Sequence, residues 1–327
     1  MFDPPDLVRR RLQCTIALLA AQPAFAEDRY PSRPITLVVP FAAGGIADLT
    51  ARVVAEAMAQ DLQQPIVVDN RPSAGNIVGS TAVAQAKPDG YTLLLMSNGN
   101  AVSASLFRKL PFDVNKDFAP VSTLGFFDLV VLANATSQYA SLAEVIDAAR
   151  KQPGRITIGT IAPGSTQNLA AELFKRTAGI DALIVPYKGS PAVLNALRGG
   201  EIDVAFEILG PMLPQIRAGA VRALAVTART RVAPLPDVPA VREAAGLGDY
   251  VVASWNALAA PAGTLPEVID RLARAAREAV ASPATRRRLE GLGVRPQAGT
   301  PAELRTLLAG EIDRWRAVIL AAHIPPQ

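Results

Sequence analysis

Apolar, strand-like runs alternate with helical patterns along most of the chain. The runs before residue 100 are ITLVVPF (35–41), PIVVDN (65–70) and YTLLLMS (91–97), and those after residue 150 are RITIGT (155–160), ALIVPY (182–187) and IDVAFEIL (202–209). Helical patterns separate them, the first over residues 47–61 and the second just before KPDG. This alternation predicts an α/β fold with parallel sheets that carry helices on both faces.

The pattern also predicts two lobes. VVPFAAGG (38–45) and IVPYKGSP (184–191) repeat one arrangement: a strand, Pro, an aromatic residue and, after two residues in the first case and one in the second, Gly, leading into a helix. FFDLVVLAN (126–134) and VRALAVTAR (221–229) flank the second set of runs and are expected to cross between lobes. We therefore predict a two-lobed fold with a mostly parallel sheet in each lobe and a ligand cleft between them. Lobe 1 is expected to comprise residues 27–125 plus 228–327, and lobe 2 residues 126–227.

The rest of the C-terminal part is predicted to be helical. One helix is expected in residues 264–282, with Thr264 as its cap and Pro266 in its first turn. A last helix over about residues 301–321 is expected to pack against the first lobe.

The N-terminus has the three parts of a secretory signal peptide. Arg9–Arg11 precede the apolar run LQCTIALLA, and Ala24 and Ala26 follow at the spacing of a cleavage site. Cleavage after Ala26 is expected to send the protein to the periplasm, and it would remove Cys14, the only cysteine. The mature chain could then form no disulfide and no thiolate metal site.

Composition and charge narrow the possibilities further. Half of the 327 residues are apolar, which suits about two well-packed domains, and no mature run reaches the roughly 18 apolar residues typical of a membrane span. The net charge of +4 comes from dispersed residues rather than a basic run. A nucleic-acid-binding surface is therefore disfavoured.

The inventory of reactive side chains argues against an enzyme. The only histidine, His323, lies near the C-terminus, so Ser-His and Cys-His nucleophiles and ordinary zinc sites lack their usual residues. GTIAPGST (159–166) has the glycine spacing of a P-loop, but Ser165 stands where the lysine should follow. We expect no catalytic residue, no metal and no cofactor. An exported enzyme that works through carboxylates is a less favoured alternative.

Four loops can instead hold an anion. Residues 41–48, 97–100, 160–168 and 187–192 all follow strands, and ligands of parallel sheets bind beyond the carboxyl ends of the strands. Backbone N–H groups at the start of the following helices can bind an anion, and a carboxylate fits better than a triphosphate because no fixed cation is present. From these loops we also predict that Ser97 and Thr160 contact the ligand.

Several long motifs occur in an order that resembles a known family. They are RPITLVVPFAAGGIADLTARVVAEAM (33–58), PIVVDNRPSAGNIVGSTAVAQAKPDGYTLLL (65–95), LPFDVNKDFAPVS (110–122), IVPYKGSPAVLNALRGGEIDVAF (184–206) and PLPDVPAVREAAGLG (234–248). From about Tyr30 to its C-terminus the chain resembles the Bug (TctC-like) extracytoplasmic solute receptors of tripartite tricarboxylate transporters. The resemblance implies a periplasmic-binding-protein fold that closes on a small carboxylate.

The resemblance also implies which residues line the site. It gives the first loop and helix start (Phe41, Ala42, Gly44, Asp48), a Gly-Ser/Thr turn (Ser165, Thr166) and the VPYKGS loop (Tyr187, Gly189, Ser190). Two positions depart from the family pattern: Asn168 replaces a usual His, and Asn195 replaces a common Asp. If both line the pocket, the ligand differs from the usual dicarboxylates or binds with less pH dependence.

Several of these residues have a purely structural interpretation as well. Asp48 and Arg52 are spaced for an ion pair within one helix, and Ser165 or Thr166 could simply cap a helix. Glu207 could meet a ligand amino group or be an ordinary surface acid. Taken together, the predicted function is a monomeric periplasmic receptor that delivers a small carboxylate to transient partners, the membrane subunits of a transporter. The alternative from another class is a ligand-sensing partner of a sensor kinase.

Overall fold

Ten strands and the helices between them make up the described part of the chain, residues 30–327 of a computed structural model. The predicted signal peptide lies outside the described residues. The strands are β1 (Ile35–Val39), β2 (Ile66–Asn70), β3 (Thr92–Ser97), β4 (Phe118–Asn134), β5 (Thr157–Ile161), β6 (Leu183–Tyr187), β7 (Val204–Ile208), β8 (Val221–Val226), β9 (Ala253–Pro261) and β10 (Arg295–Pro296). The helices are α2 (Ile46–Leu62), η1 (Ala74–Asn76), α3 (Ile77–Ala84), α4 (Asn98–Leu106), α5 (Leu142–Lys151), α6 (Thr166–Ala178), α7 (Ser190–Gly199), α8 (Leu209–Arg217), α9 (Val241–Ala244), α10 (Pro266–Ala281), α11 (Pro283–Gly291) and α12 (Pro301–Ala321).

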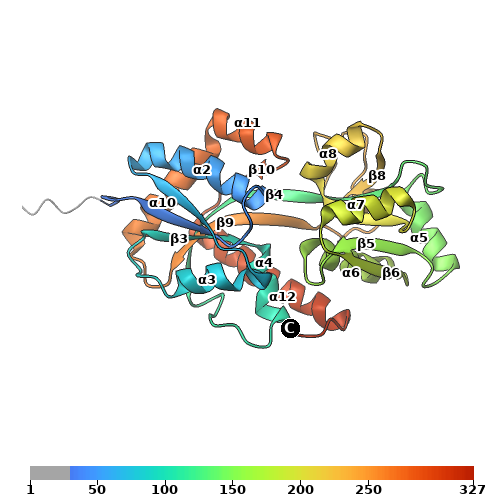
Figure 1. The fold of residues 1–327 in the computed structure, drawn as a ribbon, viewed down its shortest axis with the longest axis horizontal. Coiled ribbons are helices and arrows are strands. Elements are labelled where there is room, and N and C mark those ends of the chain that lie inside the picture. Colours follow the sequence, from blue (N-terminus) through green and yellow to red (C-terminus); the bar gives the residue numbers. More distant parts are fainter. Residues whose placement is uncertain (1–29) are drawn as a thin grey trace, which may run out of the picture. The chain divides into compact units, whose positions relative to one another are not determined.

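The strands form one mixed sheet in the order β2-β1-β3-β9-β4-β7-β5-β6, with β8 and β10 also paired to β4 (Figure 1). At one end β1 pairs in parallel with β2 and β3, and at the other β5 pairs in parallel with β6 and β7. Between them β4 and β9 run antiparallel to their neighbours. The predicted parallel βα units are therefore present at both ends of the sheet, joined by an antiparallel centre.

Strand β4, 17 residues long, joins the two parallel regions. Its first part, Phe118–Asp128, pairs with β9, while Leu129–Ala133 pairs with β7 and Val130–Asn134 with β8. Thr227, just after β8, ties the junction together because its hydroxyl donates to the carbonyl of Val252 (2.6 Å) and its N–H to that of Leu129 (2.9 Å). The predicted crossing segments are thus strands that meet at Thr227.

Local sequence explains where several helices begin and end. Ser141 and Thr300 accept hydrogen bonds from the first turns of α5 and α12, and Pro301 follows the cap, where a missing N–H costs nothing. Gly179 and Gly200 end α6 and α7 in the left-handed conformation that glycine adopts without strain. These signals are local, which is why the pattern predicted α6, α7 and α12.

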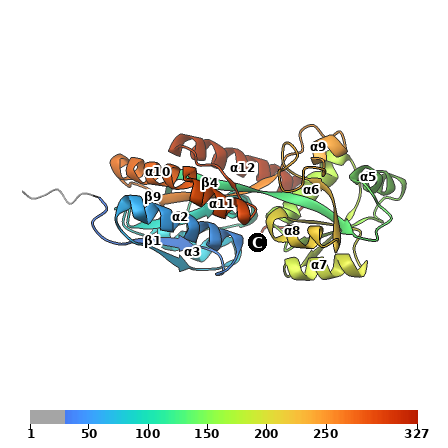
Figure 2. The ribbon, with the colours of Figure 1, turned by 90° about the horizontal axis from the view of Figure 1, so that it is seen from above.

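One face of the sheet carries the larger buried cluster. Side chains of β3, β4, β7 and β9 pack there with α4, α6 and α12. Helix α12 contacts α4, β4 and α6, and Figure 2 shows it beside β4. Trp255 and Trp315 are both fully buried in it. None of the buried side chains of α2 belongs to this cluster, and α2 packs instead with α10 and α11. The two faces of the sheet are therefore covered by different helices.

The structure confirms the α/β fold class and corrects two details. Strand β9 lies in a part of the chain for which only helices were predicted, because its Ala-rich sequence shows no alternation when both faces are buried. Thr264 is not the cap of α10: that position belongs to Leu265, and the Thr264 hydroxyl donates to the carbonyl of Pro261. Within residues 30–327, no helix combines the length and apolarity that crossing a membrane requires.

Candidate functional site

Asp48, in the first turn of α2, accepts hydrogen bonds from three residues. Its carboxylate accepts from the N–H of Gly44 (2.8 Å), the amide of Asn70 (2.9 Å) and the guanidinium of Arg52 (3.0 Å). Burial alone would raise the pKa of Asp48, but these hydrogen bonds and the Arg52 charge outweigh it and lower the pKa below its usual value. Asn70 also donates to the carbonyl of Phe41. Asp48 therefore shapes the loop after β1, as the ion-pair interpretation predicted.

Helices α2 and α7 begin without a side-chain cap. Their N-cap residues are Gly45 and Gly189, which have no side chain that could accept a hydrogen bond from the first turn. Only their carbonyl oxygens accept, from the N–H groups of Leu49 and of Ala192 and Val193. Each helix is the next element after a parallel strand, α2 after β1 and α7 after β6. Uncapped N-terminal N–H groups with a positive helix end favour an anion. The geometry thus provides two places where backbone groups could bind carboxylate oxygens.

Ser97 caps α4 and lies at the centre of a buried group of amides. Its hydroxyl oxygen accepts from the N–H of Gly99 and from the amide of Asn76, both at 3.1 Å. Asn100 completes the capping box by accepting from the Ser97 N–H. The Ser97 hydroxyl donates no hydrogen bond among the described residues. Ser97 is buried, yet it keeps one donor available.

Asn98 joins two of the predicted loops. Its amide donates to the hydroxyl of Thr166 (2.9 Å), and its carbonyl oxygen accepts from the indole of Trp315 (2.7 Å). Asn98 is fully buried. The start of α4 and the start of α6, which follow β3 and β5, are therefore side by side.

The loop after β5 is fixed by Asn168 and Ser165. Ser165 caps α6 by accepting from the Asn168 N–H (3.1 Å), while the Asn168 side chain accepts from Gly164 (3.1 Å) and donates to Thr160 (3.4 Å). Asn168 is buried and both halves of its amide are used. At this position, where the family pattern has His, the side chain holds the turn in shape.

Glu207 is a buried acid with one free oxygen. Its Oε2 accepts from the Ser190 hydroxyl (2.7 Å) and the Gln167 amide (3.4 Å), while Oε1 is buried without a partner among the described residues. Burial raises the pKa of Glu207, and Ser190, Gln167 and the backbone of Ile208 offset this only in part. This pairing brings α6, α7 and β7 together. Glu207 is therefore not an ordinary surface acid, which was one of its two interpretations from the sequence.

The other predicted residues are more exposed. Ala42 and Gly44 are exposed, Phe41, Tyr187 and Gly189 are half-buried, and Tyr187 packs against the smaller cluster of α7 and α8. Asn195 lies on the exposed side of α7, and no hydrogen bond of its side chain is present among residues 30–327. The loop after β1 makes no side-chain hydrogen bond to the other three loops within that range.

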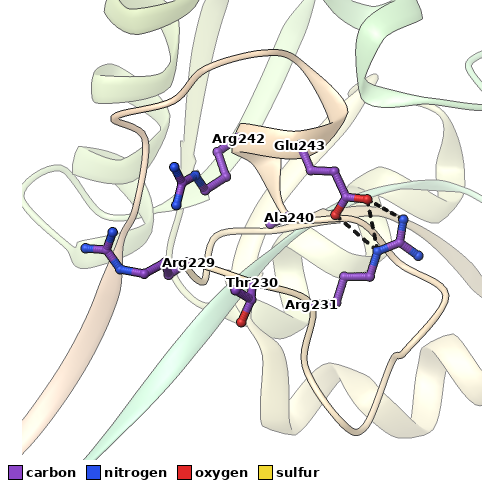
Figure 3. Close-up of a pocket in the computed structure, with 6 residues that line it drawn as sticks. All are labelled: Arg229, Thr230, Arg231, Ala240, Arg242 and Glu243. Carbon is purple, nitrogen blue, oxygen red and sulfur yellow. Dashed lines mark hydrogen bonds and ion pairs between the residues drawn. The ribbon is translucent and has the colours of Figure 1, made fainter.

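Two hollows on the described surface lie outside these loops. One of about 420 Å³ is lined by Arg229, Thr230, Arg231, Ala240, Arg242 and Glu243 (Figure 3). Arg231 is paired with Glu243, whereas the side chains of Arg229 and Arg242 have no hydrogen bond or ion pair within residues 30–327. The other, of about 400 Å³, lies between the ends of α6 and α12. Neither is lined by a predicted ligand residue.

Several polar residues of this region were not predicted. They are Asn70, Asn76, Gln167, Asn256 and Trp315. Asn70 ends a strand next to the first loop, and this position could have identified it. Asn256 could not have been found, because its strand, β9, was not predicted. The described residues contain no group of three or more His, Cys, Asp or Glu side chains that could hold a metal ion.

Comparison with known proteins identifies similar chains along nearly the whole length. The family model of the tripartite tricarboxylate transporter family receptor, TctC, matches residues 50–324. BugT of Bordetella pertussis is 38% identical over 316 residues, which cover 94% of this chain and 96% of BugT. Two solved structures are also similar: R. palustris Rpa4515 with adipate (TM-score 0.79, 32% identity, 91% of this chain and all of that one) and MatC from Rhodopseudomonas palustris with bound malate (TM-score 0.74, 33% identity, 89% and all).

Proposed function

Because the chain belongs to the TctC family of tripartite tricarboxylate transporter receptors, we propose that it binds a small carboxylate between two lobes and delivers it to a membrane transporter. The family consists of periplasmic solute-binding receptors. Two similar proteins were solved with adipate and with malate. The observation that carries the proposal is the pair of uncapped helices, α2 and α7, each of which follows a parallel strand.

The proposed lobes are residues 27–125 plus 228–327, and 126–227. Closure would bend the molecule where β4 changes partners from β9 to β7 and where Thr227 links the crossing segments. Binding is expected to draw the two loop sets together. Small-angle scattering with and without the bound acid tests this: a smaller radius of gyration with ligand supports closure, and an unchanged one contradicts it.

A thermal-shift screen of ligand-stripped residues 27–327 tests binding. The probes are mono-, di- and tricarboxylates, amino acids and aromatic acids. A specific acid at about 100 times its dissociation constant adds about 2.7 kcal/mol to the free energy of unfolding, enough for a clear rise in melting temperature. A folded protein that responds to no acid would contradict the proposal.

Gly45→Asp tests whether the start of α2 holds the carboxylate. Gly45 has extended backbone angles, and a Cβ there would make only an ordinary contact, 3.7 Å from the carbonyl oxygen of Ala42, so Asp fits as an N-cap. Its own carboxylate would take the N–H groups of the first turn. We expect the variant to be as stable as the original protein or more so, yet to lose affinity for the acid by about tenfold or more.

Leu265→Asp is the matched control. Leu265 is the uncapped N-cap of α10 and is exposed, so the substitution adds the same charge and the same cap to another helix. We expect unchanged affinity. An equal loss of affinity in both variants would show that the added negative charge, rather than the N-terminus of α2, determines binding.

Delivery and export form the rest of the proposal. Deletion of the gene should abolish uptake of the acid found in the screen, and the first residue of the exported protein should be Glu27. If uptake continues while a transcriptional response to the acid is lost, the protein is a sensor partner and not a transport receptor.

A further inference from the structure

Asn256 is a buried amide in which neither half has a partner. It is 1% exposed, and its Nδ2 and Oδ1 are both buried without a hydrogen bond among the described residues. An unsatisfied buried polar group destabilises the fold, so native proteins pair nearly all such groups. An unpaired amide of this kind needs a reason.

Other buried amides of the same region are fully paired. Asn98 is bonded to Thr166 and Trp315, Asn100 to Ser80 and the Ser97 backbone, and Asn168 to Gly164 and Thr160. The fold thus satisfies both halves of an amide in three nearby cases. Asn256 stands apart from them.

The register of the sheet places Asn256 opposite Ser97. In the antiparallel pair of β3 and β9, Ser97 and Asn256 are direct partners, so their Cβ atoms lie about 4.5–5.5 Å apart on one face. The flanking residues Met96, Trp255 and Ala257 all belong to the larger cluster, so Ser97 and Asn256 point to the other face. No buried side chain of α2 belongs to the larger cluster, and α2 packs with α10 and α11, so these helices cover the other face.

Three uncommitted polar groups therefore occur together at the carboxyl end of β3. They are the hydroxyl proton of Ser97, the NH₂ of Asn256 and the carbonyl oxygen of Asn256. Two are donors and one is an acceptor. A bare carboxylate would satisfy the donors and leave the acceptor empty. A carboxylate with a hydroxyl, amino or carboxamide group on the adjacent carbon would satisfy all three.

We propose that Asn256 is a specificity-determining residue that contacts the ligand and selects carboxylates carrying a hydrogen-bond donor beside the acid group. The inference rests on the proposed carboxylate-receptor function and specifies its substrate class. An unsubstituted acid leaves the Asn256 carbonyl oxygen unpaired in the bound state. A substituted acid pairs that oxygen and therefore binds more tightly.

Matched acids measure this preference. The probes are propionate with lactate and alanine, succinate with malate and aspartate, glutarate with α-hydroxyglutarate and glutamate, and adipate with α-hydroxyadipate and α-aminoadipate. Calorimetry on residues 27–327 gives the affinity for each. We expect at least one substituted acid to bind about tenfold or more tightly than its unsubstituted partner.

Asn256→Leu and Asn256→Ala then remove the amide. Both variants should bind the two kinds of acid about equally well. The affinity for the substituted acid should fall about tenfold, while that for the unsubstituted acid should change by less than about threefold. Asn256→Leu should also raise the melting temperature of the unliganded protein, because it removes two unpaired polar groups. Asn256→Ala keeps the test valid if the larger Leu side chain does not fit.

Ser105→Ala is the control. The Ser105 hydroxyl is also buried and unpaired, but it lies in the last turn of α4, away from Ser97. The Ser105→Ala variant should still bind the substituted acid more tightly than the unsubstituted one. The inference is overturned if the original protein shows no preference, or if both Asn256 variants keep it, as they would if the amide only binds a buried water. If no acid in any series binds, the receptor function fails as well.

Discussion

The side-chain amide of Asn98 donates a 2.9 Å hydrogen bond to the hydroxyl of Thr166, joining residues 68 positions apart in the sequence. Asn98 belongs to the first set of βα units and Thr166 to the second. Since Asn98 is fully buried and also bonded to Trp315, this contact fixes how the starts of α4 and α6 meet.

Thr166→Val should destabilise the protein. Val has the shape of Thr but cannot accept the hydrogen bond, so the Asn98 amide is left buried without a partner. We expect the free energy of unfolding to fall by about 1–3 kcal/mol in urea denaturation. Thr177→Val, at a more exposed position of the same helix, should change it by less than about 0.5 kcal/mol. Equal effects at both positions would contradict the role of the Asn98 contact.

Asp48→Asn should destabilise the protein at neutral pH by about 1.5–3 kcal/mol, because Asn cannot accept from all the donors that bind the carboxylate. The pKa of Asp48 is lowered in the folded state. Its contribution is therefore fully present above the ordinary Asp pKa and is lost as pH falls through the folded value. Urea denaturation of both proteins across acid pH should show the difference shrinking; a constant difference would be evidence against this linkage.

Glu207→Gln should stabilise the unliganded protein at neutral pH. The pKa of Glu207 is raised by burial, so the folded chain holds this proton more tightly than the unfolded chain does. The Glu207 contribution to stability is complete below the ordinary Glu pKa and is lost as pH rises toward the folded value. The variant and the original protein should therefore differ least in acid. A variant that is less stable at neutral pH would show that the carboxylate is favourably held.

Gly293→Ala should be destabilising for two independent reasons. Gly293 has a φ of +77°, and a Cβ there would meet the backbone of Gly210 at the start of α8. We expect a loss of at least about 1 kcal/mol, seen as a lower melting temperature. Gly291→Ala, where a Cβ would meet nothing, serves as the control and should be neutral or stabilising. If both variants melt alike, the close approach of Gly210 and Gly293 is not a constraint.

The sequence predicted those parts of the fold that rest on local signals. The helix α12 has the predicted bounds, because Thr300 and Pro301 mark its start and its apolar pattern runs to Ala321. Strand β9 could not be predicted, because burial on both faces removes the alternation that identifies a strand.

In the candidate site too, contacts within one helix could be predicted from the sequence, whereas contacts between distant segments could not. Ser165 and Asp48 could be interpreted from spacing within one helix, and both interact as spacing suggested. The pairing of Ser190 with Glu207, and the position of Asn256 opposite Ser97, depend on the sheet register. Register between strands far apart in sequence follows from the tertiary structure and not from any local pattern.

Strand β4 has a consequence for folding. It supplies the partner for β9 with its first part and for β7 and β8 with its second, so neither parallel region can be cut out of the chain with a complete sheet. A fragment ending at residue 125 would lack β9, β10 and α12, while one covering residues 126–227 would begin inside β4. Loss of structure in one region therefore withdraws hydrogen bonds from the other, and the chain should unfold in a single cooperative transition.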